Sequence, residues 1–252
     1  MALALVTGAS SGVGRATVLA LRARGWEVLA VARRAAHLDE LATDCAAAIH
    51  PLDAAEPVAV DALLQNLGGR TPDLIVNAAG AGRWHRLEDT SPAEARAMMD
   101  APFFAAFLIT RAFLPGMLKR GSGQIIHVNS PAAYQPWPHS ALYAASRGAL
   151  RSLHEALRQD LAGSGVISSH ITFGKVSSDY FTANLGTEER LPKIAKTFRT
   201  LSPEDCATLI LRLIDRPRAE AVHPPLMAFY LMVWRLWPGL VRWIIRITSP
   251  RP

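Results

Sequence analysis

The chain has 252 residues, of which 50% are hydrophobic and 19% are charged, and this composition excludes an intrinsically disordered protein. The length suits a single α/β domain with one large core. Two cysteines, Cys45 and Cys206, cannot build a disulfide framework or a four-thiolate zinc site, so we expect no metal centre and a reducing, cytoplasmic compartment. The net charge of +6 comes with arginines that are scattered rather than gathered in one basic run, which argues against nucleic-acid binding.

Short apolar runs and helical stretches alternate along the chain. The expected strands are Leu3–Val6, Glu27–Ala32, Ala48–Leu52, Leu74–Asn77, Gln124–Asn129, Val166–Ile171 and Glu220–His223. The expected helices are Val13–Arg24, His37–Ala46, Pro57–Leu67, Pro92–Lys119, Ala141–Leu161 and one that follows the N-cap Ser202. Apolar strands with amphipathic helices between them predict a parallel sheet covered on both faces, and right-handed crossovers make it doubly wound. We therefore expect one Rossmann-type α/β domain over residues 1–225 and an apolar helical extension over 226–252.

A glycine-rich loop follows the first expected strand and opens the first helix, with the sequence Thr7-Gly8-Ala9-Ser10-Ser11-Gly12-Val13-Gly14. Glycines allow a tight turn and a close approach of the backbone to a pyrophosphate. The start of the helix then offers free N–H groups and a partial positive charge. A turn alone would also use glycines, but their position between a buried strand and a helix predicts dinucleotide binding.

The spacing Thr-Gly-x-x-x-Gly-x-Gly resembles the short-chain dehydrogenase/reductase family, and other motifs agree with it. Asn77-Ala78-Ala79-Gly80 is similar to the family's Asn-Asn-Ala-Gly, and Asp53 follows the third strand, where the family places an acid near the adenine. Tyr143 follows Ser130 by the family's spacing. The resemblance extends from Leu3 to the region of Asp215 and implies a seven-stranded sheet, a nicotinamide cofactor and, by analogy, a homodimer or homotetramer. The cofactor contacts that we expect on this basis are Gly8, Ser10, Ser11, Gly12, Val13, Gly14, Asp53, Asn77, Ala78, Gly80, Tyr143, Arg147, Gly174, Val176 and Ser178.

The residues at the end of the second strand bear on the choice between the two nicotinamide cofactors. An acid there would bond the ribose 2′-OH and repel a 2′-phosphate, but the position is Ala32, followed by Arg33 and Arg34. A guanidinium can bind phosphate through two parallel hydrogen bonds. We therefore expect NADP(H) to be preferred over NAD(H), with Arg33 as the main contact, unless both arginines merely face solvent.

In the resembling family a Tyr is the acid and base, a Ser holds the carbonyl oxygen, and a Lys four residues after the Tyr binds ribose and lowers the pKa of that Tyr. Tyr143 and Ser130 match this pattern, whereas the Lys position is occupied by Arg147. Residues i and i+4 share a helix face, so Arg147 can still hold positive charge beside Tyr143 and bond ribose hydroxyls. A guanidinium stays charged, however, and does not readily pass a proton.

Two further stretches depart from the family pattern. The family's helical Asn, which anchors a water relay, falls on Pro102; a proline there leaves the Met98 carbonyl without its helical partner, so we expect a bend. The family's Pro-Gly-x-Val-x-Thr becomes Phe173-Gly174-Lys175-Val176-Ser177-Ser178. Val176 can bond the nicotinamide carboxamide through its backbone, and Ser178 can replace the Thr hydroxyl. Lys175 either supplies charge near the cofactor or faces solvent.

Loops beyond the carboxyl ends of the strands are expected to form the substrate pocket. Their candidate residues are mostly aromatic and uncharged, which predicts an apolar small-molecule substrate: Trp84, His85, Pro131, Tyr134, Trp137, His139, Tyr180 and Phe181.

The segment Leu226–Ile247 is as long as a membrane span, but Pro238-Gly239 and three arginines interrupt it. Arg235, Arg242 and Arg246 fall roughly on one helical face. Two interpretations stay open: peripheral contact of residues 226–247 with a membrane surface, or helices that pack over the pocket or against another subunit.

These observations predict an NADP(H)-dependent oxidoreductase that acts on a carbonyl or alcohol group of an apolar molecule, with Ser130, Tyr143 and Arg147 as catalytic residues. Two alternatives stay open. Pro102 and Arg147 motivate a lyase, isomerase or cyclase on the same scaffold. A non-catalytic cofactor-binding protein is the other, and the intact Ser130 and Tyr143 argue against it.

Overall fold

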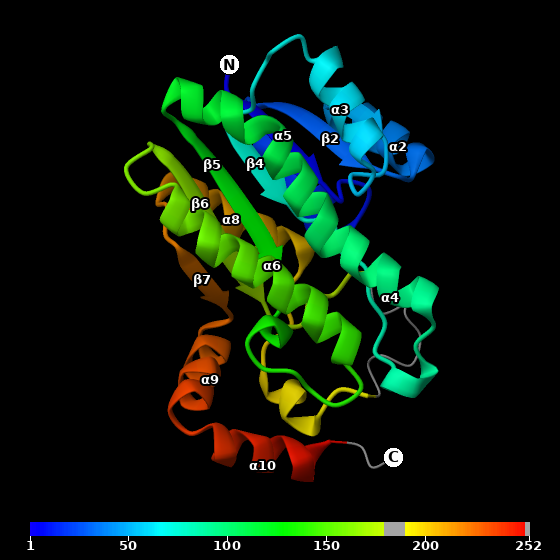
Figure 1. The fold of residues 1–252 in the computed structure, drawn as a ribbon, viewed down its shortest axis with the longest axis vertical. Coiled ribbons are helices and arrows are strands. Elements are labelled where there is room, and N and C mark those ends of the chain that lie inside the picture. Colours follow the sequence, from blue (N-terminus) through cyan, green and yellow to red (C-terminus); the bar gives the residue numbers. More distant parts are fainter. Residues whose placement is uncertain (179–189, 250–252) are drawn as a thin grey trace.

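A seven-stranded, all-parallel sheet forms the centre of the molecule, with strand order β3-β2-β1-β4-β5-β6-β7. The computed structural model describes residues 1–178 and 190–249. The strands are β1 (Leu3–Thr7), β2 (Glu27–Ala32), β3 (Ala48–Pro51), β4 (Leu74–Asn77), β5 (Gly123–Asn129), β6 (Val166–Phe173) and β7 (Glu220–His223). Helices lie in front of and behind the sheet (Figure 1). The predicted doubly wound Rossmann-type fold and its parallel seven-stranded sheet are therefore confirmed.

The described helices follow the predicted ones closely at most of their ends. They are α1 (Gly12–Ala23), α2 (Ala35–Cys45), α3 (Pro57–Asn66), α4 (Pro92–Met99), α5 (Ala105–Arg120), α6 (Ala141–Asp160), α8 (Pro203–Asp215), α9 (Pro225–Leu236) and α10 (Pro238–Thr248). The predicted N-cap of α8 is confirmed, because the Ser202 hydroxyl accepts a hydrogen bond from the Asp205 N–H and the Asp205 carboxylate accepts one from the Ser202 N–H.

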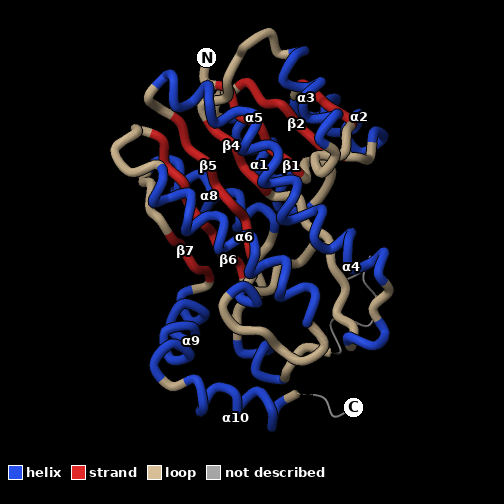
Figure 2. The backbone as a smooth tube through the Cα atoms, viewed as in Figure 1, coloured by secondary structure: helices blue, strands red, loops and turns tan. Residues whose placement is uncertain are grey.

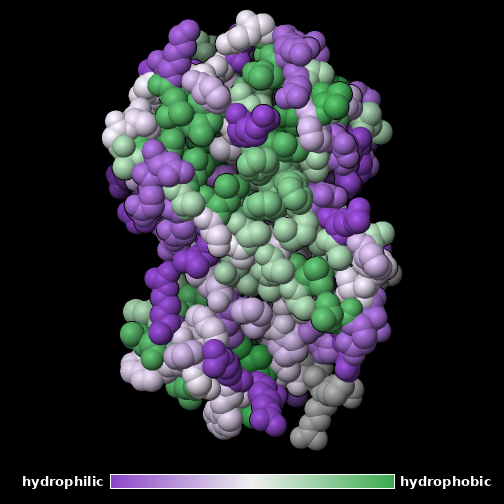
Figure 3. All heavy atoms as spheres, viewed as in Figure 1, coloured by the Kyte–Doolittle hydropathy of each residue, from purple (hydrophilic) through white to green (hydrophobic). Residues whose placement is uncertain are grey.

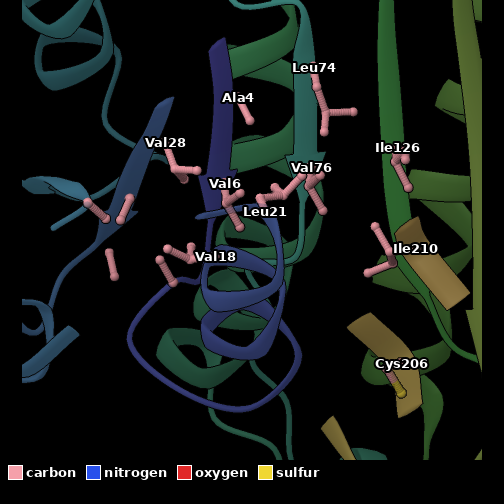
Figure 4. Packing of buried hydrophobic residues seen from close by; sticks show 14 of the residues in the cluster. Ala4, Val6, Val18, Leu21, Val28, Leu74, Val76, Ile126, Cys206 and Ile210 are labelled. Carbon is pink, nitrogen blue, oxygen red and sulfur yellow. The ribbon is translucent and has the colours of Figure 1, made fainter. Parts of the chain in front are cut away.

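The core consists of two apolar layers, one on each face of the sheet. Successive strand residues point to opposite faces, so Ala4 and Val6 of β1 pack with α1, α2 and α8, while Leu3 and Leu5 pack with α3 and α5. Figure 4 shows the first layer, in which Val18 of α1 lies close to Val6 of β1. Covering both faces explains why the central strands β1, β2 and β4 are almost entirely apolar, whereas β5 and β6 also bury polar side chains such as His127 and His170.

The predicted single helix Pro92–Lys119 is a continuous helical run in the structure, but its hydrogen-bond pattern changes part-way along. A π-helical turn, Asp100–Phe104, joins α4 to α5, and it contains Pro102 at its centre. The irregularity thus falls at the expected proline, as a change of helix type, and the bend itself stays a prediction. By length and composition Pro92–Arg120 is the one helical run among the described residues that could cross a membrane, but Ile109 and Phe113 of α5 are buried on the sheet, as in a core helix.

The two C-terminal helices lie beyond the carboxyl ends of the strands. In Figure 1 the strands point away from the N-terminus, and α9 and α10 lie beyond their far ends in both Figures 1 and 2. The apolar segment Leu226–Ile247 is therefore two helices, which separate at Pro238. Their inner residues Tyr230 and Val241 are buried in a small cluster with Phe198.

Candidate active site

One cavity of about 580 Å³ lies at the carboxyl ends of the strands, next to the point where the strand order reverses between β1 and β4. Sixteen of the seventeen predicted site residues line it, and Asn77 is the exception. They are Gly8, Ser10, Ser11, Gly12, Val13, Gly14, Arg33, Asp53, Ala78, Gly80, Ser130, Tyr143, Arg147, Gly174, Val176 and Ser178. Lys175 lines the cavity as well.

Gly8, in the loop between β1 and α1, and Gly14, in the first turn of α1, occupy positions where a larger residue does not fit. Gly8 has φ +68°, and a Cβ atom on it would lie 2.7 Å from the carbonyl oxygen of Ala78. A Cβ atom on Gly14 would overlap the carbonyl oxygen of Gly8, so the loop packs directly on the first turn of α1. The Thr7 hydroxyl ties β1 to β4 by accepting hydrogen bonds from the Ala78 and Ala79 N–H groups, both at 3.1 Å.

This loop fits the pyrophosphate of a dinucleotide. Helix α1 begins at Gly12, and no side chain caps its first turn, so the backbone N–H groups there are available to an anion. The glycines keep the space in front of these groups clear of side chains.

Two arginines follow β2 at the edge of the cavity, and the structure gives them different surroundings. Arg33 is 68% exposed, and its guanidinium lies 3.6 Å from the Asp53 carboxylate. Arg34 instead reaches back to the glycine loop, where it donates hydrogen bonds to the hydroxyls of Ser10 (2.9 Å) and Ser11 (2.6 Å). Arg33 was predicted as the main contact, yet it is the Arg34 guanidinium that forms, with these two hydroxyls, a donor cluster suited to a phosphate group.

Helix α6 places Tyr143 and Arg147 on one face, as their spacing predicts. Both residues are 8% exposed, and the Arg147 guanidinium carbon lies 5.0 Å from the centroid of the Tyr143 ring. The buried Arg147 Nε has no hydrogen-bond acceptor among the described residues, and an orphaned charged donor of this kind fits the hydroxyls of a bound ribose. Gly80 makes room for this guanidinium, because a Cβ atom there would lie 2.8 Å from it.

Asn129, the last residue of β5, connects the loop that carries Ser130 to helix α6. Its side-chain amide donates a hydrogen bond to the backbone carbonyl of Arg147 (3.0 Å), and its side-chain oxygen accepts one from the Ser130 N–H (2.8 Å). The Ser130 hydroxyl accepts a hydrogen bond from the Ala132 N–H (3.3 Å). Asn129 was not predicted as a site residue, because nothing in its spacing distinguishes it from other strand residues.

The expectation that Asn77 contacts the cofactor receives no support from its position. Its side chain is 2% exposed and lies behind the cavity wall, with its amide nitrogen 3.3 Å from the Thr110 hydroxyl and 3.3 Å from His127 Nδ1. Through these two contacts Asn77 links β4 to α5 and β5.

The substrate side of the cavity has an aromatic wall. The Trp84 ring lies 5.8 Å from the Tyr143 ring and 5.9 Å from the Trp137 ring, measured between centroids, and Pro131 lines the same cavity. Four further apolar residues of this wall were not predicted, because they come together only through tertiary packing: Leu191, Ala195, Phe198 and Met227.

Three other substrate candidates lie outside the cavity lining. Tyr134 points away from it, and its hydroxyl contacts His170 Nδ1 (3.3 Å) and the Glu220 carboxylate (3.1 Å). His85 and His139 are also absent from the lining. Tyr180 and Phe181 lie outside the described residues.

Three buried histidines lie behind the cavity, between the sheet and α6. The His154 ring is 6.0 Å from the His127 ring and 5.3 Å from the His170 ring. Burial lowers the pKa of His127 to about 3 and that of His170 to about 2, and it also lowers the pKa of His154. All three are therefore neutral near pH 7.

Comparison with known proteins agrees with this arrangement. The family model described as short chain dehydrogenase matches residues 2–189. A probable NADP-dependent dehydrogenase of Haemophilus influenzae is 32% identical over 224 residues, which cover 85% of this chain and 88% of that protein. A short-chain dehydrogenase structure from Streptomyces avermitilis matches with a TM-score of 0.81 and 24% identity, over 96% of this chain and 98% of that one. The closed form of a serine dehydrogenase complexed with NADP+ matches with a TM-score of 0.80 and 26% identity, over 89% and 95% of the two chains.

These relatives agree with the glycine loop, with the Ser130 and Tyr143 motif and with the parallel sheet. The chain therefore belongs to the short-chain dehydrogenase/reductase family of oxidoreductases.

Proposed function

We propose that the protein is an NADP(H)-dependent oxidoreductase that interconverts a carbonyl and an alcohol in an apolar small molecule. One observation carries this proposal: Ser130, Tyr143 and Arg147 line the same cavity as the glycine loop. A substrate in that cavity would therefore lie within reach of both the hydroxyl groups and a bound dinucleotide.

The cofactor, when bound, supplies or accepts the hydride of the reaction. The chain's own residues handle the oxygen and its proton. During reduction, the Ser130 hydroxyl donates a hydrogen bond that polarises the carbonyl, and the Tyr143 hydroxyl gives its proton to the oxygen as negative charge develops there. During oxidation the Tyr143 phenolate takes the proton back from the alcohol.

Arg147 is proposed to hold the ribose and to stabilise the deprotonated Tyr143. Its guanidinium lies beside the phenol ring at 5.0 Å, in a buried place where charge interactions are stronger than in water. Because a guanidinium does not give up its proton, a Tyr143 proton must exchange with solvent by a route that does not pass through this side chain.

The preference for NADP(H) rests on Arg34 together with Arg33. The hydroxyls of Ser10 and Ser11 and the Arg34 guanidinium converge at the end of the glycine loop, and Arg33 lies next to them on the cavity wall. A 2′-phosphate would find several hydrogen-bond donors there and two positive charges.

The apolar substrate class rests on the walls of the cavity. Trp84, Trp137, Phe198 and Met227 surround its substrate side, and the aromatic rings can stack on a flat or cyclic molecule.

The test is NADPH oxidation with a panel of apolar ketones and aldehydes. We expect Tyr143→Phe to lower kcat at least about 100-fold, the usual contribution of a positioned proton donor, while the Kd for NADPH stays near the wild-type value. Tyr134→Phe is the matched control, because it removes a phenolic hydroxyl from a residue that lies outside the cavity lining. Undiminished turnover in Tyr143→Phe would refute the role of Tyr143, and turnover of substrate without NADPH oxidation would favour a lyase, isomerase or cyclase.

We also propose a homodimer or homotetramer in a reducing, cytoplasmic compartment. Phe104, the last residue of the π-helical turn, and Phe107 of α5 are 41% and 38% exposed, and these apolar side chains suit a contact with a second copy. Cys45 and Cys206 are both free thiols, which is consistent with reducing conditions.

A further inference from the structure

The outer surface of α9 and α10 gathers most of the exposed apolar side chains of the molecule. Of the fifteen large hydrophobic side chains that are exposed in residues 1–178 and 190–249, seven lie on these two helices and an eighth, Trp237, lies at the junction between them. They are Leu226, Phe229, Met232, Leu236, Trp237, Leu240, Trp243 and Ile247, and we call them the C-terminal apolar face. In Figure 3, hydrophobic and strongly hydrophilic residues lie side by side at the end of the molecule where these helices are found.

The C-terminal apolar face follows from the sequence pattern of each helix. On α9 the exposed Leu226, Phe229 and Met232 recur every three residues, while Met227 and Tyr230 point inward and are buried. On α10 the exposed Leu240, Trp243 and Ile247 alternate with the buried Val241 and Ile245. Both helices are therefore apolar on two sides, and the domain covers only one of them.

The charged residues of the C-terminal segment itself are all positive. The sequence from residue 224 to residue 252 contains four arginines and no aspartate or glutamate. Arg235 lies 4.0 Å from Glu220 on β7, whereas Arg242 and Arg246 form no ion pair with a described residue. The Arg242 guanidinium instead lies 5.2 Å from the centroid of the Trp234 ring.

We propose that the C-terminal apolar face docks on the surface of an anionic lipid bilayer. Exposed tryptophans with arginines beside them suit the interfacial zone, where apolar side chains enter the acyl region and arginines meet lipid phosphates. A second copy of the chain suits this face less well. A two-fold contact through this face would place arginines of both copies in one interface with no carboxylate of this segment to balance them.

The geometry fits attachment from one side rather than insertion across the bilayer. Helices α9 and α10 have 12 and 11 residues, which is too short for either to span the hydrocarbon core. Helix α10 runs across the end of the molecule farthest from the N-terminus, so its outer side chains form an end surface (Figure 1). The opposite face of α9 contributes Met227 to the cavity, so the bilayer would lie one helix away from the active site.

The test is flotation of the full-length protein with vesicles of phosphatidylcholine alone or of phosphatidylcholine with phosphatidylglycerol. We expect the protein to float with the anionic vesicles and to stay largely unbound with the neutral ones. The double variant Phe229→Ser/Trp243→Ser should abolish flotation. The control Leu87→Ser removes an exposed apolar side chain outside the C-terminal apolar face and should leave flotation unchanged. Arg242→Gln/Arg246→Gln should weaken partitioning onto anionic vesicles about 25-fold, at roughly fivefold for each arginine.

NADPH affinity and thermal melting show whether each variant is folded, and neither readout depends on knowing the substrate. Failure of the wild-type protein to float, or equal flotation with both kinds of vesicle, would overturn the proposal. Light scattering measures the number of subunits and distinguishes the remaining outcome. If the wild-type protein does not float and Phe229→Ser/Trp243→Ser lowers the number of subunits, a second copy covers the C-terminal apolar face instead.

Discussion

Arg147 holds a charge that is fixed, buried and directly beside the phenol of Tyr143. If it binds ribose as proposed, Arg147→Gln removes charged hydrogen bonds worth about 1.5–3 kcal/mol, and we expect the Kd for NADPH to rise roughly 10- to 100-fold. Arg147→Lys keeps the charge and should retain most of the affinity. Isothermal titration with NADPH measures both variants, and Arg158→Gln, on an exposed part of the same helix, is the control. An unchanged Kd in Arg147→Gln would contradict the ribose contact.

Arg34 offers a separate test of cofactor choice. Its guanidinium bonds the hydroxyls of Ser10 and Ser11, so we expect Arg34→Gln to weaken NADPH binding about tenfold or more while NADH binding changes little. Arg33→Gln should have a smaller effect, because Arg33 is 68% exposed. Fluorescence titration with both cofactors provides the numbers, with Arg24→Gln as the control, since its guanidinium pairs with Asp215. Equal losses for NADPH and NADH would assign Arg34 to the shared part of the two cofactors instead.

At the scale of elements, the layer between the sheet and α6 contains three buried neutral histidines, and it predicts a pH dependence of stability. The pKa values of His127 and His170 are lowered in the folded protein to about 3 and about 2, whereas an unfolded histidine titrates near 6.5. The unfolded chain therefore binds more protons below that value. Stability is fully present above about pH 6.5 and falls as the pH drops towards 3, by up to about 1.4 kcal/mol per pH unit for each histidine.

Urea unfolding between pH 7 and pH 4.5 measures this loss. His127→Gln should make the fall in the free energy of unfolding less steep, because one of the two strongly shifted groups is gone. His37→Gln, which changes an exposed histidine on α2, should leave the steepness unchanged. A wild-type free energy of unfolding that stays constant over this range would rule out neutral buried histidines as a source of acid sensitivity.

The elements themselves could be predicted largely from hydrophobic periodicity, and their exceptions have local causes. Every strand was anticipated within about two residues at each end, because a parallel sheet covered on both faces favours short, mainly apolar runs between the helices. The π-helical turn at Asp100–Phe104 was anticipated only as a bend at Pro102, since the period of the sequence does not reveal how a helix reconnects its hydrogen bonds. The division of Leu226–Ile247 into two helices follows from Pro238, but which side of each helix is covered depends on tertiary packing.

At the scale of the whole molecule, the cavity is lined by some segments that carry recognisable sequence motifs and by others that carry none. The glycine loop, the Ser130 and Tyr143 pair and the loop at Gly174 carry motifs, because cofactor chemistry restricts them to few residue types. Phe198 and Met227 carry none, since any apolar residue of suitable size can fill such a wall. Asn77 shows the converse, because it belongs to a recognisable motif and yet lies outside the cavity lining.

Isotope transfer tests most directly whether this cavity performs redox chemistry with Tyr143 as its proton donor. The reaction uses NADPH that carries deuterium at both positions on the nicotinamide C4 and an apolar ketone that the wild-type enzyme turns over. Mass spectrometry should find deuterium on the former carbonyl carbon of the alcohol, in proportion to the NADPH oxidised, and Tyr143→Phe should form almost no labelled product. A product without deuterium, or labelled product at the wild-type rate from Tyr143→Phe, would contradict the proposed reaction.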